Sequence, residues 1–195
     1  VSEDQEGLVL DPLYTFARTK QIMGGDPGAW GADLRSACKS ATKFGFITGD
    51  AAIVASPANM TVRNEALGQF PKAADIQAAA YKKCSYFSVN GPYDVFDNIR
   101  SSIWQNRAEK RSVFTGVEWR PEWSGARGGV VEKVGAGTRK FGHAVKAFGW
   151  DLDNYLTLQL SNGKGIGKAG IFSLHRDVVN LAFSYGSYTF LDMPR

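Results

Sequence analysis

The sequence predicts an α+β fold in a single domain over residues 1–195. Apolar residues recur at helical spacing in the first half of the chain, and they alternate with polar residues from Val113 onward. The 195 residues are 44% hydrophobic, which is enough to bury a core. We therefore expect a mainly helical lobe over 1–110 and a mainly β lobe, antiparallel and barrel-like, over 111–195.

Capping residues mark the first two expected helices. Asp11 precedes Pro12, which is tolerated at a first helical position, and this helix is expected to end at Gly24. Asp33 is expected to cap a second helix, which Gly45 ends because glycine readily adopts the left-handed conformation of a helix terminus. The loop between these helices is rich in glycine and exposes its backbone.

The middle of the chain combines short elements. Residues 46–70 show weak periodicity and are expected to form mostly a loop, followed by a short helix over 71–80. A strand is expected over 81–89, and a further helix over 93–106 has apolar residues on one face.

Alternating patterns in the second half predict a set of mostly antiparallel strands. They are expected at 113–119, 130–134, 143–150, 155–160, 170–175 and 181–191. The strands 143–150 and 155–160 form a hairpin around Asp151 to Asn154. Residues 121–129 are expected to form an aromatic, proline and glycine loop that contains Trp123, which is a candidate for contacting a ligand in a groove, although large aromatic residues are primarily core or lobe-interface residues.

Composition argues against several functions. The net charge of +4 is modest and the basic residues are scattered, so nucleic-acid binding is not favoured. No apolar run approaches the ~18 residues that cross a bilayer, so no membrane insertion is expected. Two cysteines do not make a disulfide framework, and Cys38 and Cys84 are both expected to be buried thiols. The two histidines and two cysteines lack metal-ligand spacing, and no metal or cofactor is expected.

The most specific pattern joins a histidine to a series of glycines. Gly142-His143-Ala144-Val145 is followed by Gly149-Trp150, by Tyr155 and by glycines 163, 165, 167 and 170. In this order, the pattern resembles the papain family of cysteine peptidases, especially its divergent bacterial and viral members. The stretches 10–14, 32–47, 93–104 and 112–119 extend the resemblance over nearly the whole chain. It implies a papain-like, two-lobed fold that is incomplete at the N-terminus, because the family's cysteine-bearing helix would precede residue 10.

The resemblance implies a role for few residues. His143 matches the family's catalytic base, whereas the ungapped alignment of the glycines puts Leu160 where the family has the asparagine that orients this base. Asn162 takes that role only if the loop shifts by two residues. The loop from Gly24 to Gly31, with Gly28 and Gly31 as candidate binding residues, resembles the stretch that holds extended peptide backbone in the family.

Three functional hypotheses follow. The leading one is a papain-fold domain without its own nucleophile, acting as a binding or structural module in a larger assembly such as a virion. The second is the C-terminal part of an active cysteine peptidase whose cysteine-bearing segment lies upstream or on another chain. The third, supported only by aromatic loops, is a cell-wall or carbohydrate-binding protein. Expected partners are other protein chains or an extended peptide, and the compartment stays undecided between secreted, virion-associated and other settings.

Overall fold

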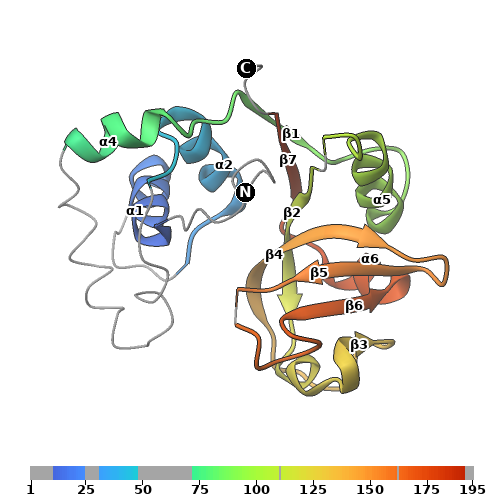
Figure 1. Cartoon of the computed structure of the whole chain (residues 1–195). Coiled ribbons are helices and arrows are strands. Elements are labelled where there is room, and N and C mark those ends of the chain that lie inside the picture. The colour runs from blue at the N-terminus through green and yellow to red at the C-terminus, as the bar shows by residue number, and fades with distance from the viewer. Residues whose placement is uncertain (1–10, 25–30, 48–71, 110, 162, 192–195) are drawn as a thin grey trace. The chain divides into compact units, whose positions relative to one another are not determined.

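The computed structural model describes residues 11–24, 31–47, 72–109, 111–161 and 163–191. The chain divides into two compact units, shown in Figure 1. The first comprises Val1–Tyr86 with Phe190–Arg195, and the second comprises Phe87–Thr189. The described part is α+β, with helices first and a mainly antiparallel sheet later, as the sequence predicted.

The described helices of the first unit are α1 (Pro12–Met23), α2 (Leu34–Lys43) and α4 (Lys72–Ala79). The expected cap is confirmed, because the Asp33 side chain accepts a hydrogen bond of 2.7 Å from the backbone N–H of Ser36. Gly45 has φ +92°, and a Cβ there would lie 2.0 Å from the carbonyl oxygen of Ala78. Only glycine therefore lets the chain leave α2 so close to α4. The small core of this unit is built on Tyr14, Ile47 and Ala78.

A seven-stranded sheet has the order β1-β7-β2-β4-β5-β6-β3. Its strands are β1 (Ser85–Ser88), β2 (Val113–Trp119), β3 (Val130–Val131), β4 (Phe141–Trp150), β5 (Tyr155–Gln159), β6 (Ile171–His175) and β7 (Ser187–Leu191). Strand β2 pairs antiparallel with β4 and β7, and β5 pairs antiparallel with β4 and β6. Strand β3 runs parallel to β6. The expected hairpin of β4 and β5 is confirmed.

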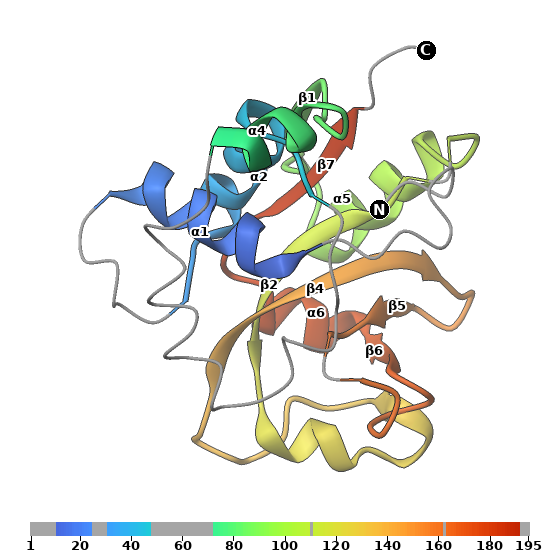
Figure 2. The ribbon, with the colours of Figure 1, turned by 60° about the vertical axis from the view of Figure 1, so that its left-hand side comes forward.

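Two helices cover the sheet of the second unit. They are α5 (Val95–Gln105) and α6 (Arg176–Ala182), and α6 lies against β5 and β6 in both ribbon views (Figures 1 and 2). The apolar stripe of α5, formed by Phe96, Ile99 and Ile103, is buried in the same core as the strands. This helix therefore belongs to the sheet unit. The unit boundary lies at 86/87, whereas composition placed the change of character near residue 111.

The prediction of a strand over 181–191 was wrong in its first part. Helix α6 ends at Ala182, and only β7 is extended. The buried residues Val178, Val179 and Ala182 show helical spacing. The helix begins after His175, whose ring Nδ1 accepts a hydrogen bond of 3.3 Å from the backbone N–H of Asp177. Histidine is not among the preferred helix caps, so this start gave no recognisable sequence signal.

An ion-pair network joins the beginnings of α5 and α6. The Arg176 guanidinium bonds to the carboxylates of Asp94 and Asp97, with 3.1 Å from its Nε to Asp94 Oδ2 and 2.6 Å from Nη2 to Asp97 Oδ2. Asp94 also caps α5 by accepting a hydrogen bond from the N–H of Asp97 at 2.9 Å. Burial alone would raise the pKa of Asp94, but the Asp97 N–H and the Arg176 guanidinium outweigh it and lower this pKa from 3.8.

The lowered pKa of Asp94 predicts a loss of stability in acid. A carboxyl group with a depressed folded-state pKa contributes stability that is present above its unfolded value and is lost as the pH falls through the folded value. We expect Asp94→Asn, which retains a helix cap, to lower the free energy of unfolding by about 1 kcal/mol at neutral pH. Urea unfolding of both proteins should give curves that converge below pH ~4. A difference that is constant down to pH ~2 would contradict this assignment.

Candidate site around His143

His143 lies on the interior face of β4, near the start of that strand. It is paired in register with Val117 of β2. Successive side chains of a strand alternate between its faces, so His143 shares a face with Val145 and Ala147, both of which are buried. The histidine itself is half-buried. Its side chain therefore stands at the edge of the core.

Aromatic rings pack against the imidazole. The His143 ring centroid lies 5.9 Å from that of Trp119 and 6.2 Å from that of Phe141, and both contacts are edge-to-face. The Trp119 ring also contacts two further rings, with centroid distances of 5.3 Å to Trp123 and 5.1 Å to Phe172. We call these five rings the aromatic cluster. Within this cluster, the aromatic rings that contact the His143 imidazole restrict its tilt by packing.

Leu160 lies in the core where the aligned family pattern has its orienting asparagine. Its side chain is 6% exposed and belongs to the same core cluster as Trp119 and Phe172. Its backbone N–H donates a hydrogen bond of 3.1 Å to the carbonyl oxygen of Gly170. A buried leucine offers no hydrogen bond to an imidazole, so the side chain here contributes packing. Asn162, the other candidate, lies outside the described residues.

The glycines after β5 have structural reasons for being glycine. Gly163, Gly167 and Gly170 have φ values of +86°, +58° and +86°. A Cβ on Gly167 would lie 2.5 Å from the Phe172 ring and 2.6 Å from the carbonyl oxygen of Ile171. The loop returns on itself through a hydrogen bond of 2.9 Å from the Gly170 N–H to the Ile166 carbonyl. This part of the glycine series maintains a turn whether or not the fold performs chemistry.

The structure describes two of the three candidate binding residues. Gly28 lies outside the described residues. Gly31 is exposed with φ +76°, and its carbonyl oxygen accepts a hydrogen bond of 3.3 Å from the Nζ of Lys20. Trp123 is only 3% exposed, and its Nε1 donates to the carbonyl oxygen of Val134 at 3.2 Å. The Trp123 ring therefore packs in the aromatic cluster of the core and is not exposed on the surface of a loop.

The two cysteines lie in different environments. Cys38 is 2% exposed on α2, where burial and then the charge of Asp33 raise the pKa of its thiol to about 12. This confirms that Cys38 is a buried thiol that resists ionisation. Cys84 precedes β1 instead of lying within a strand, and it is exposed. The prediction that Cys84 is buried was therefore wrong, because the strand begins only at Ser85.

These environments predict selective labelling of the native protein. Cys84 should react readily with iodoacetamide at neutral pH, whereas Cys38 should react at least about 100-fold more slowly, because its thiolate is scarce and shielded. Mass spectrometry of the time course should show one adduct before unfolding and two in denaturant. The Cys84→Ser variant should take up no early adduct. Equal labelling rates of both thiols in the native protein would contradict the burial of Cys38.

The described part of the chain contains no group of three or more histidine, cysteine, aspartate or glutamate side chains placed to hold a metal ion. Within the same residues, no helix is long and apolar enough to cross a membrane. The aromatic neighbours of His143 were not predicted as a group. A strand was expected over 113–119, but only the pairing of β2 with β4 brings the ring of Trp119 beside the imidazole.

Comparisons with solved structures show which fold this is. Xylellain, a cysteine protease from Xylella fastidiosa, matches with a TM-score of 0.69 at 18% identity, over 96% of this chain and 71% of its own. Procathepsin L 3 from the larval midgut of Tenebrio molitor matches with a TM-score of 0.64 at 17% identity, over 94% and 56%. Bromelain from Ananas comosus, in complex with the E64 inhibitor, matches with a TM-score of 0.59 at 17% identity, over 99% and 98%.

No protein-family model matches the sequence, and no curated protein matches it. At this low identity, the solved structures establish the fold alone. The chain has the α+β fold of papain-like cysteine proteases, with helices toward the N-terminus and an antiparallel sheet toward the C-terminus. This confirms the fold class that the histidine and glycine pattern indicated.

Proposed function

We propose that this chain is a papain-fold module without its own nucleophile, which binds other protein chains or an extended peptide instead of cleaving them. The observation that carries this proposal is the buried side chain of Leu160. In the family, an asparagine orients the catalytic imidazole, and a hydrocarbon side chain cannot replace its amide. The aromatic cluster holds the His143 ring by packing, which is a structural role.

The thiols of the described residues support the same proposal. Peptide hydrolysis of this type needs a thiolate within reach of the base. The high pKa of Cys38 leaves it almost entirely protonated at neutral pH, and its side chain is buried on α2. Cys84 is exposed, but it lies just before β1 and not at the beginning of a helix, where the thiolate would be stabilised.

A hydrolysis assay on the 195-residue chain tests the absence of catalysis. Enzymes of this kind accelerate their reactions at least about 10⁶-fold, so even a small retained fraction is measurable with fluorogenic peptides. We expect the native chain and its His143→Ala variant to show the same background rate. Hydrolysis that disappears when iodoacetamide labels Cys38 or Cys84 would exclude the proposal. Circular dichroism of both proteins verifies that each is folded.

A second function, the C-terminal part of an active cysteine peptidase, is favoured by the position of His143. The histidine of the family motif is retained on a strand whose position is held by pairing to β2. The match to xylellain covers 71% of that protein, and under this hypothesis the cysteine-bearing segment belongs to the same precursor or to another chain. Under this hypothesis the module supplies the base, and the missing segment supplies the thiolate.

Intact mass spectrometry of the natively isolated protein separates the two functions. An active peptidase requires either a polypeptide longer than this chain or a second, cysteine-bearing chain that co-purifies with it. If the natural polypeptide has the mass of this chain, 21.2 kDa, and no cysteine-bearing chain accompanies it, the enzyme hypothesis fails. Hydrolysis by a longer natural form that is lost in His143→Ala would establish it.

A further inference from the structure

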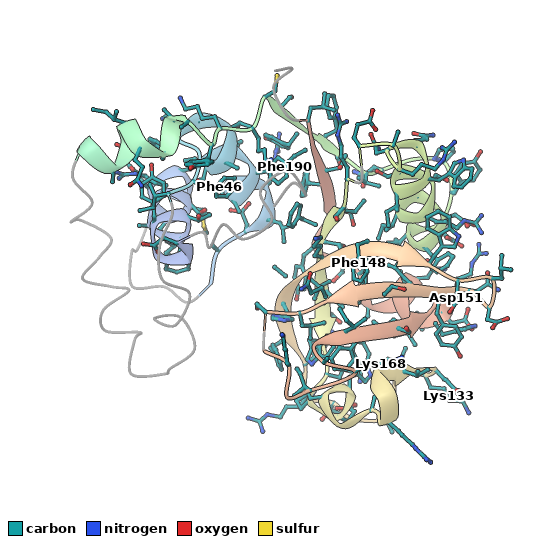
Figure 3. The ribbon with its side chains drawn as sticks, in the orientation of Figure 1. Phe46, Lys133, Phe148, Asp151, Lys168 and Phe190 are labelled. Carbon is teal, nitrogen blue, oxygen red and sulfur yellow. The ribbon has the colours of Figure 1, made fainter. Side chains whose placement is uncertain are left out.

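A rigid turn between β4 and β5 presents an apolar side chain to solvent. Leu152 is 98% exposed. The Asp151 carboxylate accepts hydrogen bonds from the backbone N–H groups of Asp153 at 3.1 Å and Tyr155 at 2.9 Å, and Asn154 adopts φ +66°. Figure 3 labels Asp151 at this outer end of the hairpin. Because the turn is already ordered, a partner that covers Leu152 pays little for immobilising the backbone.

Contacts to the body of the second unit keep this turn in place. The carbonyl oxygen of Asn154 accepts a hydrogen bond of 2.8 Å from the N–H of Arg176, at the beginning of α6. Trp150, which immediately precedes the turn, packs edge-on against Trp104 of α5 with ring centroids 6.1 Å apart. The hairpin end therefore behaves as a fixed projection. We call Asp151, Leu152 and Asp153 the acidic tip.

Carboxylates lie near the acidic tip. Burial first, and then the carboxylates of Glu132, Asp151 and Asp153, raise the pKa of Tyr155. Three carboxylates thus act on one phenol beside the tip, and Asp151 and Asp153 are themselves exposed. An exposed leucine between two aspartates fits a surface with an apolar centre and basic residues around it.

A loop with basic side chains lies at the other end of β6. His175 pairs with Tyr155 near the tip, whereas the loop 163–170 enters β6 at Ile171. This loop carries exposed Lys164 and Lys168, and Figure 3 labels Lys168 there.

A second loop completes that surface. Exposed Arg127 lies in the short 3-10 turn η4 (Arg127–Gly129), and Val130, 43% exposed, begins the edge strand β3. The two loops touch, because a Cβ on Gly129 would lie 3.0 Å from the backbone nitrogen of Lys168. We call Arg127, Val130, Lys164 and Lys168 the basic loop surface. It has an exposed valine accompanied by three cations.

We propose that the acidic tip of one copy of this chain docks on the basic loop surface of a second copy. Leu152 then covers Val130, while the aspartates of the tip face the basic side chains of the loops. Because the two surfaces differ, the contact is heterologous, and each bound copy offers a free tip or a free loop surface to the next. The contact does not depend on whether the chain hydrolyses peptides.

The test is the mass of the full 195-residue chain in solution, measured by sedimentation and light scattering over a range of concentrations. At low salt the mean mass should rise above 21.2 kDa with concentration, and in about 1 M salt the rise should require more protein, because the charges are screened. Leu152→Ser and Asp153→Lys should each weaken association about tenfold or more. The matched controls Ile76→Ser and Glu109→Lys change exposed residues elsewhere and should have no effect.

A charge-exchange experiment tests whether the acidic tip binds the basic loop surface. Lys168→Asp alone should weaken association as Asp153→Lys does, and an equimolar mixture of the two variants should recover it through the exchanged pair. A mass that stays at 21.2 kDa at every concentration overturns the proposal. So does association that the tip and loop variants leave unchanged, or that the control variants weaken equally.

Discussion

Replacing Trp119 with alanine is expected to lower the free energy of unfolding by about 3 to 5 kcal/mol, the largest single effect that we predict. Its side chain is 2% exposed and contacts Trp123, Phe172 and His143. Truncation leaves a cavity that these rings cannot fill without leaving their rotamers, and it also removes the support of the His143 ring. Urea unfolding followed by far-ultraviolet circular dichroism measures the change.

The matched control for this prediction is Trp104→Ala. Trp104 is 54% exposed and packs on Trp150 mainly by one edge. Its removal should cost about 1 kcal/mol, as expected for the loss of an aromatic pair at a surface. Similar losses for both tryptophan variants would show that Trp119 is not the centre of the sheet unit's aromatic cluster.

Replacing Leu160 with asparagine is expected to lower the free energy of unfolding by about 3 kcal/mol. The substitution removes a buried hydrocarbon and places an amide among core residues, where both its donors and its acceptor need partners. Leu160→Met retains the volume and the apolar character and should cost less than about 1.5 kcal/mol. Thermal or urea unfolding of the three proteins measures the difference.

The Leu160→Asn variant also tests the proposed function. If Leu160→Asn unfolds at the same urea concentration as the unaltered protein, the amide has found hydrogen-bond partners there, as an orienting asparagine would. That result would place Leu160 at a polar site and weaken the proposal of a purely structural position. Neither variant is expected to hydrolyse peptides, since the substitution supplies no thiolate.

Local sequence signals predicted most of the elements because each signal acts within a few residues. Asp33 caps α2 in the structure through a neighbouring N–H, and alternation predicted the buried face of β2. The hairpin of β4 and β5 followed from two alternating runs around a short turn. The missed helix α6 has a histidine cap and only seven residues, so its local signal was weaker than that of the strand that follows it.

The environment of the candidate site depended on contacts between distant residues. The resemblance to the papain family indicated the fold and His143, since it rests on a histidine and a spaced series of glycines that occur in one order along the chain. It did not show that Trp123 is buried, that Cys84 is exposed or that α5 belongs to the sheet unit. Burial depends on which strands and helices pair across long separations, such as β2 with β4. The sequence by itself thus determined the fold class, whereas only the tertiary structure decided which side chains surround His143.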